Sequence, residues 1–93
     1  MFDRILKRMR ELVRTRKYVM TLHAEDEMDS DGLTIYDVES VVLTGQIAER
    51  QRDHASAERK YLVSGRSLAG ESVIVVAKFG PTDKLVFITV FRA

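Results

Sequence analysis

The chain has 93 residues, of which 45% are hydrophobic and 31% are charged, a composition typical of one globular domain over residues 1–93. It contains no cysteine, which excludes disulfides and thiolate metal sites and fits a cytoplasmic protein. The net charge of +1 hides an asymmetry. Residues 1–17 carry seven basic and two acidic groups, whereas residues 22–40 carry seven acids and no lysine or arginine.

The first segment predicts an amphipathic helix over residues 2–13. Its apolar residues recur at three- and four-residue steps, and lysine and arginine occupy the other faces. A basic amphipathic helix can lie on an anionic membrane surface. We favour the interpretation that its apolar stripe covers a protein core, and we expect no membrane partner, since no apolar run is long enough to span a bilayer.

A short extended segment and a second helix are expected next. The β-branched and aromatic residues Tyr18–Met20 predict a short strand or an extended crossing. Thr21 suits the N-cap of the second helix, which carries acids in its first turn and ends at Asp31-Gly32.

The third helix is predicted between Thr34 and Gly45. Thr34 is the expected N-cap, Asp37 resembles the second half of a capping box, and Gly45 is the expected stop signal. Two short helices joined by a glycine-containing turn also fit a DNA-binding helix-turn-helix. The acids of residues 22–40 argue against that class, because a recognition helix must approach phosphates.

From Gln46 onward the sequence predicts a sheet. Four candidate strands cover residues 46–53, 59–65, 72–79 and 84–91, and turn-forming residues lie between them. Because short connectors join antiparallel neighbours, these strands predict a four-stranded antiparallel meander. The expected fold class is therefore α+β, with the N-terminal helices packed on one face of the sheet.

Two of these strands carry more detailed expectations. Residues 72–79 are nearly all apolar, which predicts a central strand covered on both faces. Strict alternation divides the last strand into two faces, one with Leu85, Phe87, Thr89 and Phe91 and the other with Val86, Ile88 and Val90.

His23 is the first candidate for a chemical role. A histidine can donate or accept a proton at cellular pH, and the alternative is a structural histidine hydrogen-bonded to the backbone. His23 and His54 lie on different predicted elements, and no organised set of three or four ligands surrounds them. We therefore expect no metal, and the lack of a glycine-rich phosphate loop predicts no small-molecule cofactor.

Cations on the predicted strands form a second candidate group, which comprises Arg50, Arg52, Arg59, Lys60, Arg66 and Lys78. Lys78 interrupts an apolar run at the end of a strand, where a lysine either reaches solvent or holds an anion. Tyr61 offers an aromatic ring and a hydroxyl, either to the core or to a nucleic acid. Histidine, tyrosine, lysine and arginine can together supply the base, acid and cations that metal-free RNA cleavage needs.

Several short segments share their order and spacing with a known family. They are Met20-Thr-Leu-His-Ala24, the run from Gly32 to Gly45, Lys60-Tyr-Leu-Val-Ser-Gly65, Val76-Ala-Lys78 and Phe87-Ile-Thr-Val-Phe91. Over roughly residues 3–92 the chain resembles the bacterial family called domain of unknown function 4258. The resemblance implies a small α+β domain similar to the RelE, BrnT and MqsR toxins, many of which are metal-independent ribonucleases. It also implies RNA or the ribosome as a target and a zinc-finger antitoxin as a partner.

Roles for individual residues follow from this resemblance and from the clustered cations. His23 is the expected general acid or base, and Tyr61 is expected to orient the substrate or donate a proton. Lys60, Lys78 and Arg66 are expected to bind the scissile phosphate.

Two residues depart from the family pattern. Where the common pattern has arginines, this sequence has Glu27 and Asp31, which inverts the charge of the second helix. We therefore expect one of two functions. The first is a toxin-like, metal-independent endoribonuclease of a toxin–antitoxin pair, and the alternative is a non-catalytic interaction module whose acidic helical face docks a basic partner.

Overall fold

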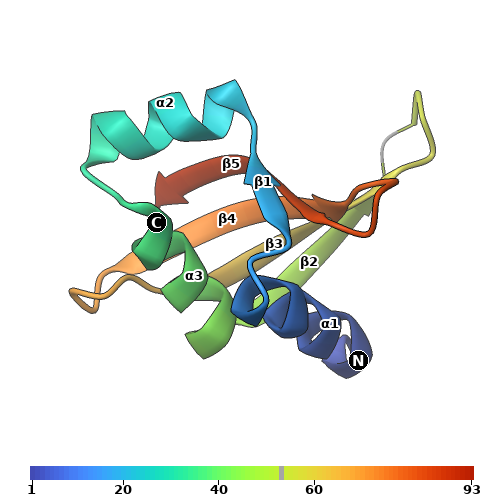
Figure 1. Cartoon of the computed structure of the whole chain (residues 1–93), viewed down its shortest axis with the longest axis horizontal. Coiled ribbons are helices and arrows are strands. Elements are labelled where there is room, and N and C mark those ends of the chain that lie inside the picture. Colours follow the sequence, from blue (N-terminus) through green and yellow to red (C-terminus); the bar gives the residue numbers. More distant parts are fainter. Residues whose placement is uncertain (53) are drawn as a thin grey trace.

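A computed structural model of the protein describes residues 1–52 and 54–93. These residues form three helices and a five-stranded sheet with the strand order β1-β5-β4-β3-β2 (Figure 1). In chain order the elements are α1 (Asp3–Arg14), β1 (Tyr18–Met20), α2 (Leu22–Asp31), α3 (Ile35–Thr44), β2 (Gln46–Arg52), β3 (Arg59–Arg66), β4 (Ser72–Phe79) and β5 (Leu85–Arg92). The fold class is α+β, as the sequence predicts.

The ends of the second and third helices form as predicted. The Thr21 hydroxyl oxygen accepts a hydrogen bond from the Ala24 backbone N–H at 3.1 Å and so caps α2. Gly32 ends that helix in the left-handed conformation, with a φ of 66°. Thr34 and Asp37 form a complete capping box at the start of α3.

Gly45 ends α3, but it does so in an extended conformation. Glycine is needed there because a Cβ atom would lie 2.3 Å from the Ser64 carbonyl oxygen. Gly65 has the converse contact, since a Cβ atom there would lie 2.3 Å from the Val41 carbonyl oxygen. These two glycines let the backbone of α3 lie close to that of β3.

The sheet has one strand more than the four predicted. Strands β2 to β5 form the expected antiparallel meander, while β1 pairs in parallel with β5, Tyr18 opposite Leu85 and Met20 opposite Phe87. Of the two alternatives predicted for Tyr18–Met20, the short strand is confirmed, but periodicity cannot reveal its pairing with a strand at the far end of the chain. Residue 53, the predicted last residue of the first long strand, lies outside the described residues.

The hydrophobic core lies on one face of the sheet, where α1 and α3 pack (Figure 1). In β4, Val73, Val75 and Ala77 face this core and are fully buried. Ile74 and Val76, which point to the opposite face, are only half-buried. The prediction of a central strand is confirmed, but the prediction that both of its faces are covered is wrong, because α1 and α3 share one side.

A β-bulge changes the facing of β5. Phe87 and Thr89 pair with neighbouring residues of β4, so Ile88 is an extra residue in β5. Phe87 and Val90 are both fully buried. The prediction that places these two side chains on opposite faces is wrong, because the extra residue shifts the alternation by one.

Helix α2 lies along the part of the β5 edge that β1 leaves open (Figure 1). The Glu27 carboxylate accepts a hydrogen bond from the Val90 backbone N–H at 3.1 Å. The Asp31 carboxylate accepts one from the Arg92 backbone N–H at 3.4 Å. These two acids take the place of a neighbouring strand, because they supply acceptors to backbone donors at the sheet edge.

Candidate functional site

His23 lies in the first turn of α2, with its side chain 68% exposed. Its Nε2 atom is 3.2 Å from Glu27 Oε1, one helical turn further along. The start of this helix is fixed to the sheet, because the Thr21 hydroxyl donates to the Ile88 carbonyl oxygen at 3.1 Å. A carboxylate therefore orients an imidazole that solvent can reach.

The surroundings of His23 are acidic. It shares a shallow depression of about 300 Å³ with Ser30 and Val90 and with the three acids Asp26, Glu27 and Asp31. The nearby carboxylates would repel a phosphate group. This depression suits a cationic or neutral group better than an RNA backbone.

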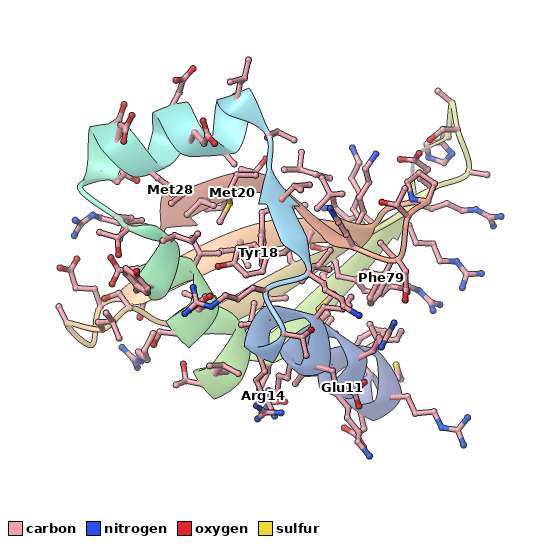
Figure 2. The ribbon with its side chains drawn as sticks, in the orientation of Figure 1. Glu11, Arg14, Tyr18, Met20, Met28 and Phe79 are labelled. Carbon is pink, nitrogen blue, oxygen red and sulfur yellow. The ribbon has the colours of Figure 1, made fainter. Side chains whose placement is uncertain are left out.

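A second depression lies where β3 begins and β4 ends. It has a volume of about 300 Å³, and we call it the sheet-end depression; it is lined by Ala57, Glu58, Arg59, Tyr61, Lys78 and Phe79. Lys78 Nζ lies 2.8 Å from Glu58 Oε2. Acidic, basic and aromatic residues thus line one small space, and Figure 2 shows Phe79 at this end of the sheet.

Tyr61 forms a wall of the sheet-end depression and is also part of the core. Its side chain is 5% exposed, and its ring meets the edges of Phe79 and Phe2 at centroid distances of 6.1 and 6.4 Å. The core alternative predicted for this tyrosine is therefore confirmed, while its contact with a nucleic acid remains a prediction.

The structure brings together some of the predicted phosphate-binding residues. Tyr61 pairs with Ala77 across β3 and β4, so Lys60 and Lys78 occupy neighbouring strands and face the same side. Arg66 lies at the other end of β3, where its guanidinium donates to the Ser72 hydroxyl oxygen at 3.0 Å. His23 lines the separate depression on α2. The roles expected for these residues remain predictions.

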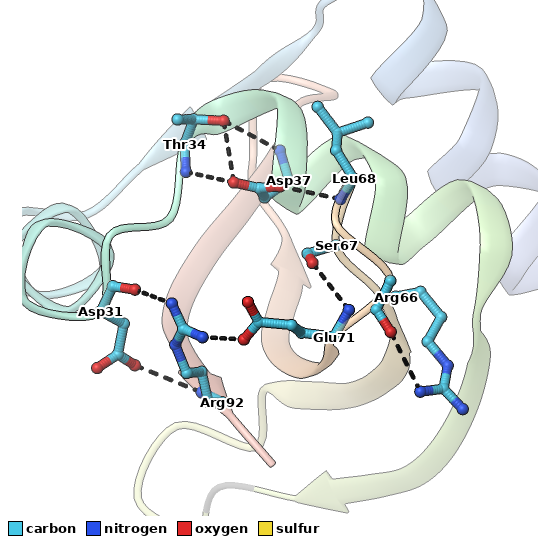
Figure 3. A network of polar contacts seen from close by, with 9 residues as sticks. Asp31, Thr34, Asp37, Arg66, Ser67, Leu68, Glu71 and Arg92 are labelled. Atoms are coloured by element: carbon cyan, nitrogen blue, oxygen red, sulfur yellow. Dashed lines mark hydrogen bonds and ion pairs between the residues drawn. The ribbon is translucent and has the colours of Figure 1, made fainter.

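A polar network joins the other end of the sheet to the helices (Figure 3). The Arg92 guanidinium contacts the Glu71 carboxylate and the Asp31 carbonyl oxygen. The Asp37 carboxylate accepts hydrogen bonds from the backbone N–H groups of Thr34, at 2.8 Å, and Leu68, at 3.0 Å. The Thr34 bond, followed by the Leu68 bond, holds the pKa of Asp37 below its ordinary value. This network stabilises a turn and gives no open site.

Glu58 and Phe79 are candidate site residues that the sequence does not reveal. Glu58 precedes the basic pair Arg59-Lys60, which is a weak local signal for an acid among cations. Only the antiparallel register of β3 with β4 places this segment beside Lys78. The site therefore depends on a long-range pairing.

The described residues contain no group of three or more acidic or histidine side chains placed to hold a metal ion. None of the helices that they form is long and apolar enough to cross a membrane.

These features define an α+β domain with helices on one face of a mixed sheet and a charged depression at the sheet end. The family described as Domain of unknown function (DUF4258) matches residues 20–92, and the chain belongs to this family. The match includes both depressions but begins after α1, later than the roughly residues 3–92 expected from the resemblance. Neither a search of curated proteins nor a search of solved structures gives a match.

Proposed function

We propose that this protein is a toxin-like endoribonuclease that cleaves RNA without a metal ion at the sheet-end depression. The observation that carries the proposal is the convergence of Glu58, Arg59, Tyr61 and Lys78 on one space, with Glu58 Oε2 2.8 Å from Lys78 Nζ. All four residues lie within the segment that matches the family. In this proposal Glu58 takes the place of His23 as the base.

The chemistry follows from these side chains. Glu58 accepts the proton of the 2′-hydroxyl as the 2′-oxygen attacks phosphorus, and the bond from phosphorus to the 5′-oxygen breaks. One fragment keeps a 2′,3′-cyclic phosphate, and the leaving 5′-oxygen takes a proton from Tyr61. Lys78 and Arg59 stabilise the additional negative charge on the phosphorane. Lys60, on the same side as Lys78, holds the neighbouring part of the backbone.

The distribution of charge supports this location over the depression around His23. Oxygen-tipped side chains follow α2, whereas many nitrogen-tipped side chains lie around α1 and along β2 and β3, with Glu11 among them on α1 (Figure 2). Arg50, Arg52 and Arg59 are all exposed on these two strands. An RNA strand would therefore approach the basic half of the molecule, which leaves the acidic half for a basic partner such as a zinc-finger antitoxin.

Cleavage of RNA by the purified protein in the presence of a chelator tests this proposal. Lys78→Met and Glu58→Gln should each lower the rate by about 10²–10⁴, the usual cost of losing a general acid–base or charge-stabilising group. Lys84→Met is the matched control, because Lys84 is an exposed lysine of the next turn that does not line the depression. Absence of cleavage by the wild-type protein, together with harmless expression in bacteria, would refute the proposal.

A second candidate function, a non-catalytic interaction module, is favoured by a groove on α3. Its volume is about 340 Å³, and its lining is mainly apolar, with Tyr36, Leu43 and Leu68 beside Glu39, Ser40 and Thr44. Tyr36 is 54% exposed and Leu68 is 71% exposed. Since residues 22–40 carry seven acids and no lysine or arginine, the fitting occupant is an amphipathic helix with a basic rim.

A synthetic amphipathic helix of leucine and lysine is a suitable probe for that groove. Leu68→Ser combined with Tyr36→Ser should weaken its binding, whereas Leu22→Ser, at an exposed leucine outside the groove, should not. Equal binding by all three proteins would eliminate the groove as a docking site. Specific binding by a protein that cleaves no RNA would favour the interaction module over the ribonuclease.

A further inference from the structure

We infer that a groove along α1 binds the backbone of a single-stranded RNA that extends from the sheet-end depression. The groove has a volume of about 370 Å³, and we call it the α1 groove; it is lined by Asp3, Leu6, Lys7, Arg10, Arg14 and Gln46. The inference rests on the proposed function for the identity of the strand. It goes beyond the family, whose match begins at residue 20 and omits α1.

The cations of the α1 groove are arranged along one side of the helix. Lys7, Arg10 and Arg14 follow one another at steps of three and four residues, so they share a face. Arg10 is fixed, because its guanidinium donates to the carbonyl oxygens of Val42 at 3.1 Å and Gly45 at 2.9 Å. Lys7 and Arg14 are exposed on either side of it.

The spacing of the two exposed cations suits more than one phosphate. Arg14 lies seven positions after Lys7, which corresponds to about 10 Å along a helix axis. Successive phosphates of one strand rise by about 3.4 Å along a duplex axis and lie farther apart along the backbone itself, so a distance of about 10 Å is long enough to reach from one phosphate to another. Each exposed cation can therefore meet a different phosphate.

Other side chains connect the α1 groove to the sheet-end depression. A third depression, of about 240 Å³, shares Asp3, Leu6 and Gln46 with the α1 groove and is also lined by Phe2. The Phe2 ring in turn contacts the ring of Tyr61 at a centroid distance of 6.4 Å. A strand can pass from one depression to the other across these shared residues.

Aromatic rings alternate with cations along this path, which favours a single strand over a duplex. Phe79, in the sheet-end depression, is 38% exposed. Phe2 is half-buried, and Arg50 Cζ lies 5.8 Å from the centre of its ring. Unpaired bases can stack on such rings while cations meet the phosphates, whereas the bases of a duplex already stack on one another. Figure 2 shows Phe79 and Arg14 toward opposite ends of this region.

The binding of 2′-O-methyl RNA tests the inference, because such strands lack the hydroxyl needed for cleavage and report binding alone. Fluorescence anisotropy would compare strands of about 4 and about 16 nucleotides, the range of known single-strand site sizes. The variant is Lys7→Gln with Arg14→Gln. The matched control is Lys17→Gln with Lys84→Gln, which removes the same charge from exposed positions outside the α1 groove.

The α1 variant should bind the long strand more weakly than wild type and bind the short strand equally well. For the long strand, its slope of log K against log salt should be shallower by about 1.4, since each lost phosphate contact removes about 0.7. The control should keep most of the wild-type slope. The inference would be overturned if the variant and the control lost the same affinity for the long strand, or if the variant lost the same affinity for both strands. If the wild-type protein binds the long strand through Lys7 and Arg14 but cleaves no RNA, the inference about the α1 groove stands. Only the proposal that the protein is a ribonuclease is then rejected.

Discussion

Glu27 accepts a hydrogen bond from the backbone N–H of Val90 at 3.1 Å, which joins α2 to the open edge of β5. The same carboxylate oxygen lies 3.2 Å from His23 Nε2. Glu27 and Asp31 are the two positions at which the family resemblance implies arginine, and Asp31 accepts the next available edge N–H, from Arg92. These two acids therefore have a structural role, because they satisfy backbone donors that β1 leaves without a strand partner.

Substitutions at Glu27 should separate its charge from its role as an acceptor. Glu27→Gln keeps an oxygen beside the Val90 N–H and should change the free energy of unfolding little. Glu27→Arg removes the acceptor and should destabilise the fold by about 1–3 kcal/mol, the usual cost of an unpaired buried donor. Thermal unfolding measures this, since 1 kcal/mol corresponds to about 4–8 °C in a domain of this size. An equal loss for Asp29→Arg, at an exposed position of the same helix, would contradict the explanation.

Asp37 should stabilise the fold in a pH-dependent way. Its carboxylate links the start of α3 to the turn at Leu68, so Asp37→Ala should cost about 0.5–2 kcal/mol, as for other helix caps. Because the folded-state pKa of Asp37 is lowered, its contribution is present above the ordinary pKa of about 4 and is lost as the pH falls through the lowered value.

Urea unfolding of the wild-type protein and Asp37→Ala at neutral and acidic pH checks this expectation. The difference in stability between the two proteins should narrow below about pH 4. Asp29→Ala serves as the control, because it removes an exposed carboxylate of α2. A difference that stays constant into the acidic range would show that the carboxylate charge of Asp37 does not matter.

Tyr18 should show the opposite pH dependence. Its hydroxyl donates to the Glu39 carboxylate at 2.5 Å, and burial, followed by this bond, raises the pKa of the phenol. Tyr18→Phe should therefore cost about 1.5–3 kcal/mol near neutral pH, the range for a hydrogen bond to a charged group. The stabilisation is complete below the ordinary tyrosine pKa of about 10 and is lost as the pH rises toward the raised value.

Unfolding at pH 8 and at about pH 11 measures this effect, with pH 11 chosen to exceed the ordinary tyrosine pKa. If folded Tyr18 keeps its proton, wild type should lose more stability than Tyr18→Phe between these two conditions. Tyr36→Phe, at an exposed tyrosine of α3, should behave like wild type. Parallel losses in wild type and Tyr18→Phe would show that the Glu39 contact does not hold the proton.

The parts of the fold that the sequence predicts correctly depend on residues that are close together in the sequence. Thr21 caps α2, and Thr34 with Asp37 forms the capping box of α3, because each motif spans only a few positions. The strand β1 depends instead on a partner almost seventy residues away, between Tyr18 and Leu85. Local periodicity carries no information about such a pairing, so the predicted sheet lacks this strand.

The contrast between local motifs and long-range pairing also explains which residues of the candidate site the sequence could predict. The sequence identifies Tyr61 and Lys78 as candidates from their residue types and their positions in strands. It cannot show that Glu58 lies beside Lys78, because that contact depends on the register of β3 with β4. Nor can it separate His23 from the other candidates, since only the tertiary structure places α2 at the β5 edge.

The relative roles of His23 and Lys78 provide a test of where any cleavage occurs. His23 is exposed on α2 among three acids, whereas Lys78 lies beside Glu58 and Arg59. His23→Ala should therefore leave RNA cleavage within a few-fold of wild type, while Lys78→Met should lower it by about 10² or more. Circular dichroism would check that both variants fold. His23→Ala should fold like wild type, because the His23 side chain is exposed. A large loss in His23→Ala with little change in Lys78→Met would move the active site to α2, where Glu27 would orient the imidazole as an acid or base.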